Sequence, residues 1–316
     1  MNADSDKTFK ILAIDGGGIR GVVPAHIIQQ MHAKFRVTPA QHFDLIAGTS
    51  TGAIIAAALA CEIEPSAIID LYKKHGSRIF RKKWSLIPSS LGLGWLKSLL
   101  HSSYTHDELS KLLREVFGDK KLGEVKIPLM LPSTDIGNGR VHVFKSGYSD
   151  KFTRDPDVFV RDAVIASCSA PTFFDPYKMK EYLLVDGGLW ANNPALTATI
   201  EAIHRMNKDP KSLRVLSLGT GHEKTYYEQV PSLFGWGFLT RWKRKNFISL
   251  ILSLQSQAAH NHLKLMLPES QWMRLNFESD KELPLDDITA VDSLIAKADK
   301  LFTDESDKLK AFLETI

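Results

Sequence analysis

The chain has 316 residues, of which 44% are hydrophobic and 24% charged, a balance typical of a globular protein with a sizeable core. Its net charge of +4 is too small to predict nucleic-acid binding, but it is compatible with an anionic membrane surface or an anionic ligand. The two cysteines, Cys61 and Cys168, lie in apolar helix-like stretches, so we expect reduced core thiols and no metal site.

The start of the chain, residues 1–6, is polar and acidic and does not resemble a signal peptide. The longest apolar run, 53–61, is far shorter than the roughly 20 residues that a membrane span needs. We therefore expect a cytoplasmic protein that meets membrane only peripherally, at the inner membrane when it is active.

Short apolar runs alternate with helical patterns from the start of the chain. Residues 9–14 and 43–47 are predicted to be buried strands, and each leads through a glycine-rich turn into a helix. The first of these helices begins near Pro24, because proline fits the first turn of a helix. The second, 53–61, is apolar on all sides and is therefore expected at the centre of the fold. A further helix is predicted around Ile68.

The middle of the chain continues the alternation after an excursion. Residues 75–105 are rich in Arg, Lys and Trp and predict a lid-like excursion rather than core. Thr105 is expected to cap a helix that runs to Phe117, with Glu108 completing a capping box. Strands are then predicted at 125–131, 140–144, 182–185 and 213–218, and helices at 158–167 and 194–206.

Apolar rather than alternating strands, interleaved with helices, predict a three-layer α/β/α fold with a mostly parallel central sheet. We expect a single domain over 1–316, with its motifs in 8–221 and a largely helical C-terminal part, 232–316, of uncertain role. Within that part the patterns predict a basic and aromatic stretch at 232–245, helices at 247–267 and 291–313, and a strand at 272–277.

The motif Gly48-Thr-Ser-Thr-Gly52 follows the second predicted strand and precedes the apolar helix. Gly-x-Ser-x-Gly between a strand and a helix is typical of a nucleophile elbow, a strained turn that projects the serine hydroxyl above a sheet. The flanking Gly48 and Gly52 allow the close backbone approach that this turn needs. We therefore predict that Ser50 is a catalytic nucleophile; the alternative is a serine in a structural turn.

The turn Asp15-Gly-Gly-Gly-Ile-Arg-Gly21 allows two interpretations. It fits the Gly-x-Gly-x-x-Gly of dinucleotide-binding proteins, but these need an acidic residue at the end of the next strand, and the nearest, Asp44, lies within it. Consecutive glycines at a helix start can instead direct free N–H groups at developing negative charge, as in an oxyanion hole. We favour the oxyanion hole; a non-catalytic nucleotide-binding module is the alternative.

A serine hydroxyl is a poor nucleophile without a neighbouring base. Asp186 is favoured because it ends a predicted strand and precedes two glycines, so that its carboxylate would point into the crevice of Ser50. A Ser–Asp–His triad, as in an α/β-hydrolase esterase, also remains open. The other downstream candidates are Asp135, Asp157, Asp162, Asp175, His204, His222, His260 and His262.

Three of these stretches, in order and spacing, resemble the signatures of patatin-like phospholipases: 15–21, 48–52 and Asp186-Gly-Gly-Leu-Trp-Ala-Asn-Asn-Pro194. The stretch 166–174 also resembles one that recurs in this family. The resemblance covers 8–221. It implies the patatin-like fold, hydrolysis of acyl esters of membrane glycerophospholipids through an acyl-enzyme, and a Ser–Asp dyad with neither histidine nor metal.

Mapped onto this chain, the resemblance implies that Ser50 attacks the ester carbonyl while Asp186 takes its proton. The N–H groups of Gly17 and Gly18 would hold the oxyanion, with Arg20 as helper. The other motif residues are Gly16, Gly21, Gly48, Gly52, Gly187 and Gly188.

Two neighbouring features have structural interpretations. Arg20 could instead form an ion pair, for example with Asp15. Asn192 and Asn193 are expected to brace the turn that follows Asp186 rather than to act chemically.

A narrower resemblance, to phospholipase effectors of bacterial anti-phage signalling, implies a cyclic dinucleotide as activator. The basic and aromatic segments 78–97 and 232–245 have three interpretations: solvated surface, a membrane-contacting rim, or a pocket for the cyclic dinucleotide. The expected partners are thus membrane phospholipid and this nucleotide ligand, with no nucleic acid; a homo-oligomer is compatible with the sequence.

Overall fold

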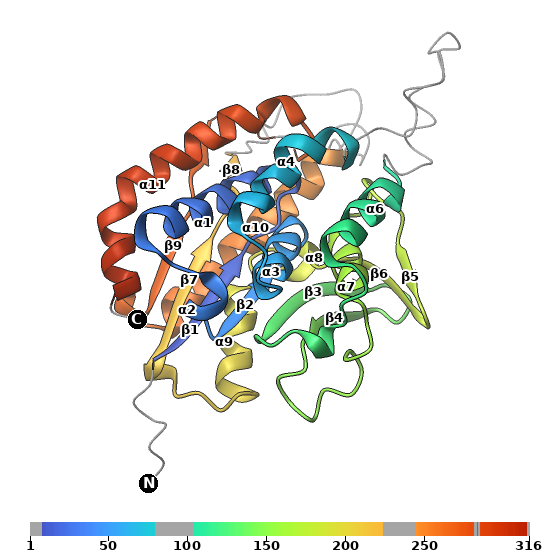
Figure 1. The fold of residues 1–316 in the computed structure, drawn as a ribbon, viewed down its shortest axis with the longest axis horizontal. Helices are drawn as coiled ribbons and strands as arrows, with labels where there is room; N and C mark the ends of the chain where they lie inside the picture. Colours follow the sequence, from blue (N-terminus) through green and yellow to red (C-terminus); the bar gives the residue numbers. More distant parts are fainter. Residues whose placement is uncertain (1–7, 80–103, 224–243, 281–282, 284, 315–316) are drawn as a thin grey trace, which may run out of the picture.

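The computed structural model describes residues 8–79, 104–223, 244–280, 283 and 285–314. Within them an eight-stranded sheet lies between two layers of helices, which confirms the predicted three-layer α/β/α fold (Figure 1). The strands follow in the order β5 (Tyr177–Met179), β6 (Tyr182–Asp186), β3 (Leu129–Asp135), β2 (Leu45–Gly48), β1 (Phe9–Ile14), β7 (Leu213–Leu218) and β9 (Trp272–Leu275), and β4 (Arg140–Lys145) also pairs with β3.

The sheet is parallel from β3 through β9 and antiparallel at its other end. β4 and β6 run antiparallel to β3, and β5 runs antiparallel to β6. A small separate sheet joins β8 (His222–Glu223) to β10 (Glu278–Ser279). The sheet is therefore mostly parallel, as predicted, but the strand that ends at Asp186 belongs to its antiparallel part.

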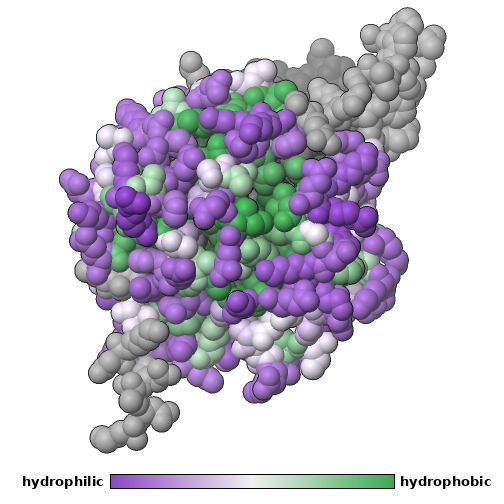
Figure 2. Space-filling model, viewed as in Figure 1, coloured by the Kyte–Doolittle hydropathy of each residue, from purple (hydrophilic) through white to green (hydrophobic). Residues whose placement is uncertain are grey.

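One face of the sheet is covered by α1 (Val22–Phe35), α3 (Thr51–Ala60), α4 (Pro65–Ile79), α6 (His106–Phe117), α7 (Val160–Cys168) and α11 (Val291–Glu314), with α2 (Pro39–His42) beside α3. Figure 2 shows hydrophobic residues among these helices, bordered by hydrophilic side chains. The other face carries α8 (Gly188–Ala191), α9 (Ala195–His204) and α10 (Arg244–Met266). No described helix is both long and apolar enough to cross a membrane.

Both faces of the sheet are buried, which explains why its central strands are apolar without alternation. Leu12 and Ile14 of β1 pack into the cluster under α1 and α3, whereas Ile11 and Ala13 pack into a second cluster under α9. All four are fully buried, because successive side chains of a strand point to opposite faces.

β2 and β6 meet the same edge of β3 end to end. Leu129 and Met130 of β3 pair with β2, residues 133–135 pair with β6, and β4 occupies the opposite edge. β2 runs parallel to β3 and β6 runs antiparallel to it, so the carboxyl ends of β2 and β6 point towards each other. This convergence places the turn after β2 against the last residue of β6.

The C-terminal part completes the structure of the described core. β9 extends the central sheet beside β7, and α10 covers α8 and α9. α11 packs along α1, where the His26 imidazole contacts the Asp299 carboxylate at 2.6 Å. The C-terminal part, whose role the sequence does not reveal, thus helps to build the sheet and its two helical layers.

Some predicted boundaries are wrong. α4 continues through Ile79, so the first residues of the predicted excursion are helical, and residues 80–103 lie outside the described part of the chain. α6 begins after Thr105, but the Thr105 side chain makes no capping hydrogen bond. β3 begins only at Leu129, because Pro128 has no N–H to offer a strand ladder.

Candidate active site

Ser50 occupies a sharp turn between β2 and α3. Its φ of 56° and ψ of −123° place it in a left-handed region that residues with a side chain rarely adopt. A Cβ on Gly48 would overlap the Gly52 carbonyl, and a Cβ on Gly52 would overlap the carbonyl of Ile14. The flanking glycines are thus needed for close packing, and the turn has the strained geometry of a nucleophile elbow.

The elbow is braced by α7. The Ser50 N–H donates to the Ser167 hydroxyl at 3.0 Å, and that hydroxyl donates to the Pro132 carbonyl at 2.6 Å. The Cys168 thiol donates to the Ser50 carbonyl at 3.0 Å. Burial, and secondly the charge of Asp186, raise the pKa of Cys168 well above its ordinary value, so this thiol remains a neutral donor.

Asp186 lies beside Ser50, at the end of β6. Its carboxylate accepts the Gly188 N–H at 2.7 Å and interacts with the Ser50 side chain, which lines the same cavity. Burial raises the pKa of Asp186 to about 6, although its interactions with Ser50 and with the Gly188 N–H act to lower it. At neutral pH this residue is therefore an ionised, poorly solvated carboxylate in contact with a serine hydroxyl, which is what a general base requires.

The peptide groups of the glycine loop are held in a fixed orientation. The Gly16 carbonyl accepts the Thr220 hydroxyl at 2.8 Å, and the Gly17 carbonyl accepts both the N–H and the Nε of Arg20 at 3.2 Å. Because C=O and N–H of a planar trans peptide point in opposite directions, these contacts turn the N–H groups of Gly17 and Gly18 away from Thr220 and Arg20.

The same two glycines line the cavity that contains Ser50 and Asp186. Among the described residues, no acceptor is hydrogen-bonded to the N–H of Gly17 or Gly18. The N-terminus of α3 also begins immediately after Ser50 and adds a positive end of a helix dipole. The site thus presents donors that could stabilise an oxyanion.

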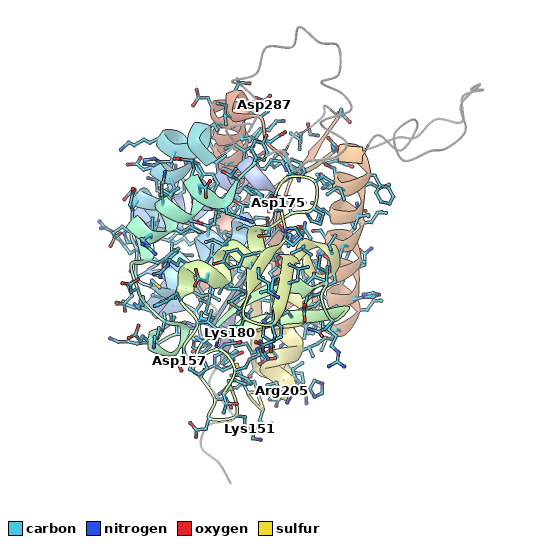
Figure 3. All side chains as sticks on the ribbon, turned by 90° about the vertical axis from the view of Figure 1, so that its right-hand side faces the viewer. Lys151, Asp157, Asp175, Lys180, Arg205 and Asp287 are labelled. Atoms are coloured by element: carbon cyan, nitrogen blue, oxygen red, sulfur yellow. The ribbon has the colours of Figure 1, made fainter. Side chains whose placement is uncertain are left out.

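The cavity at Ser50 is predominantly apolar. Its further lining consists of side chains from α3, α4, α6, α8, α10 and two loops, including Ile54, Tyr72, Leu109, Phe173, Phe174, Leu189, Ile248, Leu252 and Leu285. Two residues labelled in Figure 3 adjoin or nearly adjoin this lining in the sequence: Asp175 follows Phe174, and Asp287 comes two residues after Leu285. Both are in the upper half of the view, whereas Lys151 and Arg205 are in the lower half. An apolar cavity of this kind suits an acyl chain.

Arg20 does not line this cavity. Its side chain is 6% exposed and faces a separate polar cavity behind the glycine loop. The alternative of an ion pair with Asp15 is not what forms, because Asp15 pairs with Arg274 through oxygen–nitrogen distances of 2.7 and 3.1 Å. Arg20 can therefore affect the oxyanion only through the Gly17 carbonyl that it holds.

The alternatives to a Ser–Asp pair find little support. No histidine of the described residues lines the cavity at Ser50. His222 and His260 face the polar cavity, and His204 and His262 are exposed. Asp44, the acidic residue of the dinucleotide interpretation, accepts the Lys10 N–H at 2.8 Å, before β2 and away from the glycine loop.

Asn192 and Asn193 form hydrogen bonds with backbone groups around the site, as expected. The Asn192 carbonyl accepts the Gly16 N–H at 3.0 Å, and the Asn193 side chain accepts the Ala195 N–H at 3.0 Å. Sequence reasoning missed their partners on α10, because the C-terminal hundred residues carried no recognised motif. Gln255 accepts the Asn193 N–H at 3.2 Å, and Ser256 donates to Asp15 at 2.7 Å.

Other expectations are not resolved by the structure. The basic and aromatic segments lie almost entirely in 80–103 and 224–243, outside the described residues. Within the described ranges, no three His, Cys, Asp or Glu side chains gather in a group that could hold a metal ion.

A nucleophile elbow after a strand, a buried carboxylate on its serine and a glycine loop with oriented N–H groups together define a serine hydrolase. Residues 12–199 match the family model described as patatin-like phospholipase, and the chain belongs to that family. This confirms the resemblance drawn from the three glycine motifs, together with the enzyme class: the chain is a phospholipase of the serine hydrolase type.

Relatives in plants and bacteria agree with this assignment. "Patatin-like protein 2" of Arabidopsis thaliana is 32% identical, over 79% of this chain and 69% of its own length. A "cGAMP-activated phospholipase" of Escherichia coli strain TW11681 is 28% identical, over 91% of this chain and 82% of its own. A "cUMP-AMP-activated phospholipase" of Escherichia coli is 28% identical, over 86% and 82%.

Proposed function

We propose that the protein hydrolyses acyl esters of membrane glycerophospholipids with Ser50 as nucleophile and Asp186 as the only base. The observation that carries this proposal is that Ser50 and Asp186 lie together in one apolar cavity, beside the N–H groups of Gly17 and Gly18.

In the first half-reaction, Asp186 accepts the proton of the Ser50 hydroxyl while the oxygen attacks the ester carbonyl. The resulting oxyanion is stabilised by the N–H groups of Gly17 and Gly18, whose orientation Arg20 and Thr220 maintain. Collapse of the tetrahedral intermediate breaks the ester bond. The departing lysophospholipid alcohol takes the proton from Asp186 and leaves an acyl-serine.

In the second half-reaction, Asp186 removes a proton from water, and the hydroxide formed attacks the acyl-serine. The same N–H groups hold the second oxyanion, and collapse returns the proton to the Ser50 oxygen as the fatty acid leaves. The apolar cavity keeps the acyl chain in place through both steps, and its low polarity strengthens the hydrogen bonds to the oxyanion.

The second part of the proposal is activation by a cyclic dinucleotide at the inner face of the membrane. It rests on relatives whose names carry such activation and on the family resemblance. A phospholipase in the compartment of its own membrane needs restraint, and a ligand that is present only during infection would supply it.

The test is fatty-acid release from vesicles of phosphatidylethanolamine and phosphatidylglycerol by wild type and Ser50→Ala, with and without a panel of cyclic dinucleotides. We expect release from wild type alone, and only with one nucleotide. Release without any nucleotide would contradict the activation. No release under any condition, with Ser50 unreactive towards a fluorophosphonate, would contradict the hydrolase itself.

A further inference from the structure

A second cavity of about 370 Å³ lies behind the glycine loop. Cavities of at least about 300 Å³ are the size at which proteins hold small ligands. Most of the side chains that line it are polar. They come from the glycine loop, the segment after β7, α10 and β9, and include Asp15, Arg20, Thr220, Glu223, His260 and Arg274. Of these groups, the reaction at Ser50 uses Arg20 and Thr220 only through the carbonyls that they hold.

Arg20 is a charged side chain of this cavity that has hydrogen-bond donors without an acceptor among the described residues. Its Nε donates to the Gly17 carbonyl, and its two terminal nitrogens have no hydrogen-bond partner among the described residues. Burial lowers the pKa of Arg20 to about 10, although the charges of Glu223 and Asp15 act to raise it. A buried guanidinium with free donors is unfavourable unless an anion supplies acceptors.

The nearby carboxylates are engaged elsewhere. Asp15 accepts hydrogen bonds from Arg274 and from Ser256, at 2.7 Å each. Glu223 accepts the Leu283 N–H at 2.8 Å. These acidic neighbours therefore raise the pKa of Arg20 without accepting hydrogen bonds from its terminal nitrogens.

Neutral donors surround the same space. The Nδ1 atom of His260 is buried without a hydrogen-bond partner, and the ring lies edge to face against Trp272 at 5.0 Å. Burial, and secondly the charge of Arg274, lower the pKa of His260 to about 4, so the imidazole is neutral at physiological pH. Ser249 and Ser253 add hydroxyls from α10. Because Arg274 is balanced by Asp15, Arg20 is the cation whose terminal nitrogens are available to a ligand, although Glu223 also lines the cavity. A guanidinium among neutral donors can bind a singly charged anion such as a phosphodiester.

Arg20 links this cavity to the catalytic loop. The guanidinium that faces the cavity is the same group that holds the Gly17 carbonyl, and the orientation of that peptide sets the direction of the Gly18 N–H. An anion on the terminal nitrogens would fix the guanidinium and, with it, the glycine loop.

We propose that the polar cavity binds a phosphodiester on Arg20, and that binding sets the glycine loop for reaction at Ser50. The second half of this proposal rests on the proposed function. Cyclic dinucleotides and phospholipid head groups both carry this group, so the ligand is either an activator or the head group of the lipid.

The binding test uses calorimetric titration of the full chain carrying Ser50→Ala, so that no turnover occurs. The probes are cyclic GMP–AMP, glycerophosphoglycerol as a head group, and inorganic phosphate. Arg20→Gln removes the positive charge and the guanidinium, and Ser253→Leu fills the cavity from α10. Ala258→Leu adds the same side chain to an exposed position of the same helix and serves as the matched control.

We expect one phosphodiester to bind at least tenfold more weakly to Arg20→Gln and to Ser253→Leu, with Ala258→Leu unchanged and all variants folded by circular dichroism. Binding of the nucleotide identifies an activator site, and binding of glycerophosphoglycerol identifies a head-group site. Binding of inorganic phosphate alone, no binding at all, or binding to both cavity variants as tight as to the chain that carries Ser50→Ala alone would overturn the proposal.

The coupling to the loop is measured by the rate at which a fluorophosphonate labels Ser50 in wild type. We expect the bound phosphodiester to accelerate labelling at least fivefold, and the acceleration to be absent in Ser253→Leu. Binding without acceleration would overturn the coupling. Binding is measured without turnover, so a failure to release fatty acid from vesicles would count against the phospholipase proposal and not against the site.

Discussion

The two cavities on either side of the glycine loop differ in almost every respect except their shared wall. Asn192 lines both of them. On one side, apolar side chains surround Ser50 and Asp186, and burial raises the pKa of the carboxylate. On the other side, Arg274 neutralises Asp15, and Arg20 is buried with free donors. The difference shows how one loop can contact two different cavities, because the C=O and the N–H of each peptide group point to opposite sides.

The largest effect should come from the base in the apolar cavity. Asp186→Asn is expected to lower fatty-acid release by about 10⁴-fold, because the amide cannot accept the Ser50 proton. The measurement is initial rate on a soluble ester and on vesicles. Asp157→Asn is the matched control, since this carboxylate is exposed and pairs with Lys121. Activity retained by Asp186→Asn would show that another base operates.

The charges of the polar cavity should matter for stability. Arg274→Met leaves Asp15 buried with only the Ser256 hydroxyl, and breaking such a buried pair costs about 3–5 kcal/mol of unfolding free energy. Urea denaturation would measure it. Lys121→Met breaks an exposed pair and should lower the unfolding free energy far less than Arg274→Met does. Equal losses in the two variants would contradict the contrast between buried and exposed pairs.

Asp186 should destabilise the fold at neutral pH. Its folded-state pKa is about 6, against an ordinary value of 3.8. As pH rises from 3.8 to about 6, the Asp186 carboxyl is ionised in the unfolded chain before it is ionised in the folded protein. The unfolding free energy therefore falls over this range, and the loss stays constant at higher pH. Asp186→Asn should therefore raise the unfolding free energy above pH 6 by up to about 3 kcal/mol, and by nothing below pH 4. A gain independent of pH would exclude this cause.

The same raised pKa predicts the pH dependence of wild-type activity. The ionised carboxylate is the active form, so kcat/KM on a soluble ester should rise with pH and level off above a midpoint near 6. The rate at pH 5 should be about tenfold below the plateau. A midpoint near 4 would mean that burial does not control this carboxylate.

The smallest effect should come from the hydroxyl that orients the first peptide of the loop. Thr220→Val keeps the shape of the side chain that packs on Gly17 but removes the hydrogen bond to the Gly16 carbonyl. A net hydrogen bond contributes about 1 kcal/mol, so we expect kcat to fall about fivefold with KM unchanged. Thr134→Val, at a hydroxyl that donates to the Asp186 carbonyl, tests whether the effect is specific to the loop.

The sequence predicted the elements that repeat a simple pattern. β1 and β7 have the predicted bounds, because each is an apolar run that leads into a glycine-rich turn, and α11 has almost the predicted bounds, because its apolar residues recur with the period of a helix. Ser50 and Asp186 are predicted to be the catalytic pair from the glycines around them, since a strained turn and a close approach need residues without side chains. The structure places Asp186 beside Ser50 as expected, at the carboxyl end of β6, a strand that runs antiparallel to β3.

Long-range partners could not be predicted. Arg274 on β9 pairs with Asp15, and Gln255 and Ser256 on α10 brace the loops that carry the site, although nothing in their local sequence marks them. Pairing across more than 60 residues depends on the packed fold and leaves no periodic signal. Ser167 and Cys168 were nearer to recognition, because their stretch matched one that recurs in the family.

One contact of the glycine loop bears on how the enzyme is made. The Ile19 N–H donates to the Leu285 carbonyl at 2.8 Å, so the start of the chain is held by a segment near its other end. Ribosomes add about 5–20 residues per second, and the 266 residues between these two positions therefore take roughly ten to fifty seconds to synthesise. Until then the nascent chain carries Ser50 without the contact that holds the glycine loop. The loop beside Ser50 can therefore take its final conformation only after the C-terminal segments have been synthesised.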